Sequence, residues 1–243
     1  MIHLSNRAVI SISGADARSF LQGLTTQDVN LLAPEKALYA ATLSPQGKYL
    51  FDYFLSLDGD KILLDIFASR TDELIKKFTM YKLRSDVQIE KTDLQVYADA
   101  LLGLPDPRSD KLPKRLITHE AKKTDGDLAS YELLLLQQGV PDSDDFIIDK
   151  SFIMNYRFED LHGVSFTKGC YVGQENTARM KYKGTVRKSI YIVEGQPLPP
   201  FGTEIEGLGT MLSSQGNLGI ALCEIDAVEN FSDAALKILA PSY

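Results

Sequence analysis

The chain has 243 residues, of which 44% are hydrophobic and 24% charged, as is ordinary for a folded globular protein. This length allows one large domain or two moderate ones, with a core that needs neither disulfides nor a metal. The 26 Lys and Arg against 33 Asp and Glu give a net charge of −7, which excludes a globally basic nucleic-acid-binding domain. No apolar run approaches the roughly 18 residues that cross a bilayer. The N-terminus lacks the charged and then apolar pattern of a secretion signal, so we expect a cytoplasmic protein without a membrane segment.

The first half of the chain mixes strand and helix patterns. Ser13 is expected to cap a helix with Asp16 in a capping box, because Ala17 to Leu24 carry apolar residues at helical spacing. Further helices are expected from Ser69 or Thr71 onward and over 127–138 before Gly139. Strands are predicted over residues 8–13, 38–43, 49–57, 61–66, 87–90 and 94–101. Hairpins without a regular βαβ alternation indicate an α+β fold.

The pattern of apolar residues and turn residues changes near residue 180. Three prolines make residues 104–114 a loop, and after Gly184 short apolar runs alternate with Gly and Pro. Strands over 185–193, 218–225 and 236–239 with such turns are typical of a small β-barrel or sandwich. We therefore expect an α+β domain over 1–180 and a β-domain over 181–243.

Metal-ligand spacing is missing from the sequence. The two cysteines, Cys170 and Cys223, and the three histidines form no Cys-x-x-Cys or His-x-x-x-His pair. A metal site built by this chain alone is therefore not expected, whereas a cluster held jointly with a partner remains open. Cys223 follows Ile-Ala-Leu and is interpreted as a small apolar residue of a barrel strand.

The segment Thr167–Glu175 has an unusual composition. Gly169 and Gly173 bracket Cys170, and Lys168 lies two residues before the cysteine. Glycine permits a close backbone approach, and a nearby positive charge favours the thiolate, the form that attacks electrophiles or binds metal. The alternative interpretation is a buried cysteine in a glycine-rich turn.

A basic run follows this segment. Residues 176–193 hold no acidic residue but contain Arg179, Lys181, Lys183, Arg187 and Lys188. If Arg179 to Lys183 form a strand, its three charges lie on one side and could attract a phosphate, a polycarboxylate tail or an RNA backbone. A solvated strand face is the alternative.

The segment KGCYVGQE, Lys168 to Glu175, resembles the signature of the YgfZ family, and ARMKYKG after it continues the resemblance. Further similar segments occur in family order over about residues 5–190. They are residues 19–29, Ser44–Lys48, Tyr81–Arg84, Asp106–Arg108 and Gly139–Pro141.

The resemblance implies a fold similar to the aminomethyltransferase (T-protein) of the glycine cleavage system. That fold is a ring of α+β subdomains around a central channel, followed by a C-terminal β-barrel. It also implies a tetrahydrofolate-binding accessory protein that supports the maturation or repair of iron–sulfur enzymes, including tRNA-modifying ones. Iron–sulfur enzymes or assembly proteins would be its partners, with an indirect link to tRNA.

By the same resemblance, Cys170 is the residue on which activity depends. The resemblance assigns binding or positioning roles to Lys168, Gly169, Gly173, Gln174 and Glu175 in its loop. Arg7 and Tyr131 fall where some members carry folate-flanking tryptophans, and Asn155 falls where many carry a glutamate. The basic segment 179–188, with Arg179, could attract the folate's polyglutamate tail, or an acidic or RNA-bearing partner.

Two enzymatic alternatives remain open. A folate-dependent, aminomethyltransferase-like one-carbon transferase needs a general acid or base, and the sequence offers no convincing aspartate counterpart for it. Cys–His nucleophilic catalysis would pair Cys170 with His162, eight residues before it, although His-Gly is more typical of a turn.

Overall fold

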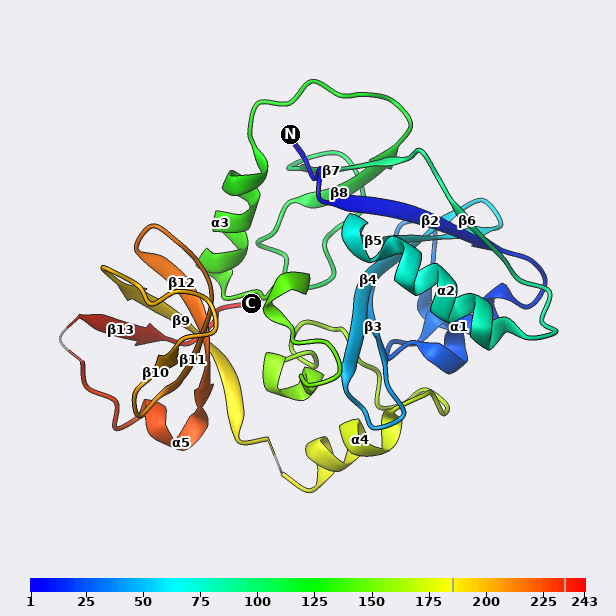
Figure 1. Cartoon of the computed structure of the whole chain (residues 1–243). Coiled ribbons are helices and arrows are strands. Elements are labelled where there is room, and N and C mark those ends of the chain that lie inside the picture. Colours follow the sequence, from blue (N-terminus) through cyan, green and yellow to red (C-terminus); the bar gives the residue numbers. More distant parts are fainter. Residues whose placement is uncertain (185, 234) are drawn as a thin grey trace.

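The computed structural model describes residues 1–184, 186–233 and 235–243. In these residues the strands form antiparallel sheets that helices cover at the outside (Figure 1). The five-stranded N-terminal sheet has the order β3-β4-β5-β2-β6. Its strands are β2 (Arg7–Ser13), β3 (Leu38–Leu43), β4 (Tyr49–Asp58), β5 (Lys61–Phe67) and β6 (Gln88–Lys91).

Both faces of this sheet are buried, which explains the nearly continuous apolar sequence of β4 and β5. One face, with Phe51, Tyr53 and Leu64, packs against α1 (Ala17–Leu24) and α2 (Thr71–Lys82). The other face, with Phe54 and Leu63, points to the centre of the molecule. Polar residues on this second face therefore become central residues of the fold.

A small sheet and a helix close the centre from the other side. The sheet has the order β1-β7-β8, with β1 (Ile2–His3), β7 (Gln95–Asp99) and β8 (Lys114–Thr118). Helix α3 (Leu128–Gln138) begins with a bond from the Ser130 amide to the Asp127 side chain. It ends at Gly139, whose φ of 68° is the left-handed conformation that glycine favours.

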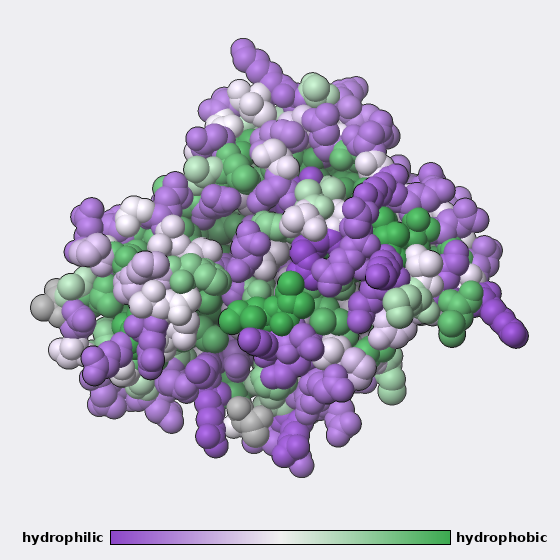
Figure 2. Space-filling model, viewed as in Figure 1, coloured by the Kyte–Doolittle hydropathy of each residue, from purple (hydrophilic) through white to green (hydrophobic). Residues whose placement is uncertain are grey.

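The C-terminal strands form a further five-stranded sheet with the order β10-β11-β12-β9-β13. They are β9 (Lys188–Gly195), β10 (Glu204–Ile205), β11 (Gly209–Gln215), β12 (Leu218–Glu224) and β13 (Leu236–Leu239), with the short helix α5 (Ile225–Val228). Ile190, Ile192 and Ile220 of this sheet join the central core with Leu135 and Leu136 of α3. Figure 2 shows a face of the molecule on which hydrophilic side chains predominate.

The predicted strands 8–13, 38–43, 49–57, 61–66, 218–225 and 236–239 and the three predicted helices are confirmed, with ends shifted by at most three residues. The cap of α1 differs from the prediction. Its N-cap is Asp16 and no side chain caps it, because the Asp16 carboxylate accepts from the Asp86 amide instead. The α+β fold class is confirmed.

Other predictions needed correction. The predicted loop over 104–114 is confirmed up to Lys114, where β8 begins. Strand β8 was not predicted, nor were β10 and β11, which lie in a stretch where glycines and prolines obscure the strand pattern. The predicted strand 185–193 begins on Thr185, which lies outside the described residues, and β9 starts at Lys188. The expected strand over 179–183 is instead the end of helix α4 (Gln174–Tyr182). Its acidic Glu175 lies in the first turn and its basic residues in the last turn, as the helix dipole favours. The domain boundary near residue 180 stays a prediction.

Candidate functional site

Cys170 is exposed at the surface, on the loop that leads into α4. Lys168, two residues before it, and Tyr171, directly after it, are both buried at 7% exposure. The Val172 amide donates to the Gly23 carbonyl at 3.1 Å, and the Gln174 amide donates to the Tyr171 carbonyl at 3.2 Å. A thiol that points outward from a loop anchored on both sides is accessible to a partner and held in a defined place.

The Lys168 side chain anchors this loop. Its ammonium donates to the carbonyls of Gln22 (2.8 Å), Thr25 (2.7 Å) and Gln27 (2.9 Å). Burial lowers the pKa of Lys168 to about 8. Because this ammonium is turned into the fold, its geometry supports a positioning role and not the expected activation of the cysteine.

The turn Ser44–Gly47 packs against the start of α4 at Gly173. A Cβ at Gly173 would lie 2.5 Å from the Ser44 carbonyl oxygen, and one at Gly47 would lie 2.9 Å from the Asn176 Cβ. Gly173 also has a φ of 85° at the N-cap of α4. The Asn176 side-chain amide donates to the Gln46 carbonyl at 2.7 Å. The turn Ser44–Gly47 thus sets the position and direction of α4.

Three signature residues border an open groove beside the start of α4. Gly173, Gln174 and Glu175 line an open groove of about 630 Å³ together with Pro45 and Tyr81. Gly169 is exposed, and no atom lies within 4 Å of the Cβ position it lacks. Its place in the structure therefore shows no packing reason for glycine.

Asn155 and Arg179 come together at the other side of α4. They line a groove of about 390 Å³ with Asn176, Arg187 and Lys188. Since residues 174–182 are helical, Arg179 and Lys181 point in different directions from the helix axis instead of sharing one strand face. Lys181 pairs with Glu159, whereas Arg179 faces the groove.

Arg7 and Tyr131 lie in a buried polar network. The Arg7 guanidinium donates to the Asp65 carboxylate at 2.7 Å, and Arg115 binds the same carboxylate from the small sheet. The Tyr131 hydroxyl accepts from Arg108 (2.8 Å) and Arg115 (2.9 Å). Burial raises the pKa of Tyr131. Burial would also raise the pKa of Asp65, but the charges of Arg115 and Arg7 more than offset it, so that this pKa lies below its usual value.

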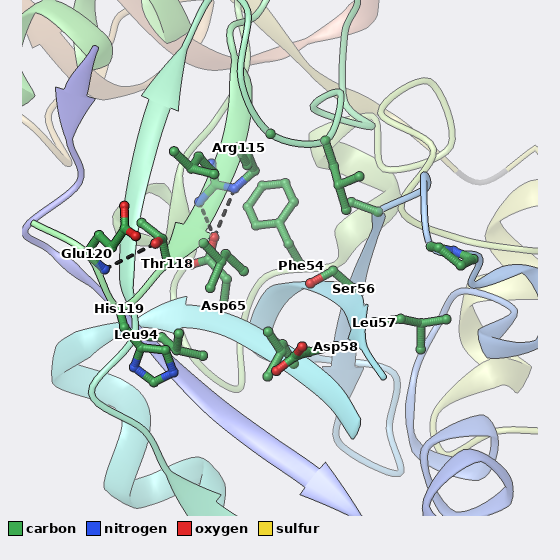
Figure 3. Close-up of a pocket in the computed structure, with 17 residues that line it drawn as sticks. Phe54, Ser56, Leu57, Asp58, Asp65, Leu94, Arg115, Thr118, His119 and Glu120 are labelled. Atoms are coloured by element: carbon green, nitrogen blue, oxygen red, sulfur yellow. Dashed lines mark hydrogen bonds and ion pairs between the residues drawn. The ribbon is translucent and has the colours of Figure 1, made fainter. Parts of the chain in front are cut away.

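A cavity of about 640 Å³ opens beside this network (Figure 3). Arg115 and Asp65 point toward each other at its wall, with the Phe54 ring alongside. The Arg115 guanidinium carbon lies 3.8 Å from the centre of that ring. Arg7 and Tyr131 do not line this cavity, and Asn155 belongs to the groove at α4. Arg7, Tyr131 and Asn155, expected to flank the folate ring, are therefore not brought together around one space.

Sequence reasoning missed several central residues. Asp52 accepts bonds from the hydroxyls of Tyr39, Tyr49 and Ser143 at 2.6–2.9 Å. Asp65 and Arg115 form the network, and Asp106 binds Arg108. A single charged residue inside an apolar strand, as in LFDYFL and ILLDIF, is the signal that could have identified both strand aspartates as buried and paired.

The other candidate residues have ordinary surroundings. His162 is exposed, and its Nδ1 lies 3.0 Å from the Pro107 carbonyl oxygen. Cys223 is buried in β12, where burial raises the pKa of its thiol to about 12, as expected for an apolar strand residue. Among the described residues, no group of three or more His, Cys, Asp and Glu is placed to hold a metal ion. No helix in the same residues has the length and apolar character to span a membrane.

Comparison with known proteins identifies the relatives of the chain. No protein-family model matches it. Over 93% of the chain it is 29% identical to the mouse (Mus musculus) "Iron-sulfur cluster assembly factor IBA57, mitochondrial" and covers 78% of that protein. It is 30% identical to the homologue from the fungus Pyricularia oryzae over 94% of the chain and 72% of the relative. The human (Homo sapiens) protein is 29% identical over 90% of the chain and 76% of its own length.

The fold matches a solved structure of the aminomethyltransferase T of the glycine cleavage system from Bartonella henselae. The TM-score is 0.70 at 12% identity, over 93% of this chain and 78% of that one. This similarity confirms the expected T-protein-like fold and, at such an identity, the fold alone.

The relatives correct one expectation. The proteins from mouse, human and Pyricularia oryzae are all named as mitochondrial. The expected cytoplasmic location, which depended on the absence of a secretion signal, is therefore wrong.

Proposed function

Because the chain belongs to the family of iron-sulfur cluster assembly factors named IBA57, we propose that it assists cluster assembly by offering the Cys170 thiolate as a ligand. The observation that carries this proposal is the exposure of Cys170 on a loop fixed by Lys168 and Val172. The cluster is the cargo of the protein and is shared with a partner.

The number of accessible thiols argues for a shared cluster. A [2Fe–2S] or [4Fe–4S] cluster is usually held by four cysteine thiolates. This chain has two cysteines, and Cys223 is buried with 0% exposure. The chain alone therefore supplies one thiolate at most, and the other ligands belong to iron–sulfur assembly proteins or enzymes.

The chemical step is a ligand exchange. Cys170 loses its thiol proton to solvent, and its sulfur forms a bond to a cluster iron as another thiolate leaves that iron and takes up a proton. The iron and sulfide atoms keep their oxidation states, so no oxidant or reductant is needed. The fixed loop reduces the conformational freedom that is lost on binding.

The transferase alternative has less support. Asp52 is 2% exposed, and its carboxylate already accepts bonds from three hydroxyl groups. A general base must lie within hydrogen-bond reach of its substrate, and Asp52 is buried away from any substrate.

The indirect link to tRNA, through tRNA-modifying iron–sulfur enzymes as clients, stays a prediction.

Tetrahydrofolate is the second candidate ligand, and the residues present do not fit it at the expected place. Arg7 is bound to Asp65, and the Tyr131 hydroxyl is bound to two arginines. The cavity in Figure 3, at about 640 Å³, is within the usual size of ligand pockets and is lined by Asp65 and Arg115 of this network. A calorimetric titration that gives no heat with tetrahydrofolate removes this candidate.

The proposal is tested with a [2Fe–2S] cluster held by glutathione thiolates. Mixed with the reduced chain without oxygen, the cluster is expected to acquire a visible circular dichroism signal, because binding to Cys170 places it in a chiral environment. Cys170→Ser is expected to abolish this signal, and the matched control Cys223→Ala, at a buried sulfur, is expected to keep it. An unchanged signal in Cys170→Ser, or no signal with the unsubstituted chain, would contradict the proposal.

A further inference from the structure

The groove beside α4 is a concentrated basic surface on an acidic protein. We call it the basic groove and define it by Asn155, Asn176, Arg179, Arg187 and Lys188. No carboxylate is among its lining residues in the part of the chain that the structure describes. The whole chain carries 26 basic and 33 acidic residues, so this surface has the opposite sign to the protein's net charge.

The two arginines of the basic groove are available for an external anion. Lys188 is paired with Glu224 at 2.9 Å, and the neighbouring Lys181 is paired with Glu159. For Arg179 and Arg187, both exposed, no carboxylate of the described residues lies within ion-pair distance. A further cation lies beside the groove. Phe152 lines the groove, and the Lys48 ammonium lies 3.2 Å from the centre of its ring.

The chemistry of the groove favours a carboxylate-rich peptide. Guanidinium groups bind carboxylates through paired hydrogen bonds, and the side-chain amides of Asn155 and Asn176 add neutral polar contacts. Phe152 and Met180 supply apolar surface in the same groove, which a peptide can contact between its charged side chains. An RNA backbone would favour a basic track longer than the three cationic side chains that line this groove.

The groove also lies close to Cys170 along the chain. Helix α4 begins after Gly173, and its nine residues span roughly 13 Å at about 1.5 Å per residue. A specific protein interface covers about 800 Å² on each partner, a patch roughly 30 Å across. A partner that presents a cluster to Cys170 would therefore extend over α4. In Figure 2 hydrophilic side chains predominate along the lower edge of the molecule, where Figure 1 places this helix.

We propose that the basic groove binds a carboxylate-rich segment of the partner protein that supplies the remaining cluster ligands. This inference depends on the proposed function, because it identifies the chemistry of the partner at the same site. Attraction between the arginines and the acidic segment orients the partner before the cluster reaches Cys170 and speeds the encounter.

The test uses a fluorescent peptide rich in Asp and Glu, with a Gln- and Asn-containing peptide of equal length as the neutral probe. Fluorescence anisotropy at low salt is expected to detect binding of the acidic peptide alone. Arg179→Gln combined with Arg187→Gln is expected to weaken this binding by about tenfold or more. The matched control combines Lys61→Gln and Lys76→Gln, which removes the same charge from exposed positions elsewhere and is expected to change the affinity little.

Three results would overturn the inference. They are no binding of the acidic peptide to the unsubstituted chain, an equal loss in the lysine control, and tighter arginine-dependent binding of a short single-stranded RNA than of the peptide. The assay contains no cluster, so its failure is independent of the glutathione–cluster experiment. If Cys170→Ser still takes up the cluster, the proposed function is contradicted. The peptide experiment on the basic groove gives its result independently of that outcome.

Discussion

At the scale of single residues, Asp65 is a charged side chain held entirely inside the fold. Its side chain has 0% exposure and lies on the central face of β5, where it faces Arg7 from β2 and Arg115 from β8. Each guanidinium is itself nearly buried, at 3% and 4% side-chain exposure. The three charges stabilise one another only as a set, because removing one partner leaves a buried charge without compensation.

We therefore expect Asp65→Asn to lower the free energy of unfolding by about 3–5 kcal/mol. The amide keeps the size of the carboxylate but leaves two buried guanidinium groups facing each other across a neutral side chain. Urea unfolding followed by circular dichroism measures the change. Asp58→Asn, at the exposed end of the β4–β5 hairpin, is the control and is expected to stay within about 0.5 kcal/mol of the unsubstituted chain. A loss below about 1 kcal/mol in Asp65→Asn would show that the network contributes little to stability.

At the scale of elements, the agreement between sequence and structure follows the strength of the local pattern. Strands β2 to β5 and helices α1 to α3 carry long apolar periodicities with clear turn residues, and their positions were predicted within three residues. Residues 179–183, at the end of helix α4, were predicted as a strand because Arg-Met-Lys-Tyr-Lys alternates. Thr177 is the one buried residue of this helix, so its sequence carries no apolar helical face. Cys170 and its glycine-bracketed loop were identified from the sequence as a candidate site, but the sequence left open whether the thiol is exposed or buried, and the structure shows it exposed. The pairing of Lys168 with three carbonyls of residues 22–27 could not be predicted, because those residues are about 140 positions away.

The junction of α4 with the turn at Ser44–Gly47 leads to a prediction at this scale. Gly173→Ala places a Cβ 2.5 Å from the Ser44 carbonyl oxygen at a positive φ, whereas Gly216→Ala meets the same backbone penalty with no atom within 4 Å. We expect Gly216→Ala to lower the stability by about 1 kcal/mol and Gly173→Ala by about 2–4 kcal/mol. Chemical unfolding of both variants measures the difference, and the rate of Cys170 alkylation is expected to change in Gly173→Ala alone. Equal losses in the two variants would mean that the two turns do not fix each other.

At the scale of the whole molecule, one core runs from the N-terminal sheet through α3 into the C-terminal sheet. Asp145 connects these parts through hydrogen bonds as well. Its carboxylate oxygens accept from the Ser213 amide in β11 and from the Asp142 amide, both at 2.9 Å. The residue is 1% exposed, and burial raises its pKa from 3.8 to about 6. The Asp145 carboxyl group, which contacts both parts of the chain, therefore has a pKa of about 6.

The raised pKa predicts that the protein loses stability between pH 4 and 7. Between about 3.8 and 6 the folded chain holds a proton on Asp145 that the unfolded chain has released. Its stabilising contribution is thus complete below the unfolded pKa and disappears as the pH rises through about 6, a change of roughly 3 kcal/mol. Burial also raises the pKa values of Glu132 and Asp144, which act in the same direction. The contribution of Asp145 is therefore measured as the difference between the unsubstituted chain and Asp145→Asn. Urea unfolding at several pH values is expected to give a smaller slope for the variant, since the amide does not titrate. A slope equal to that of the unsubstituted chain would show that Asp145 is ionised in the folded protein throughout this range, with the Ser213 and Asp142 amides compensating for its burial.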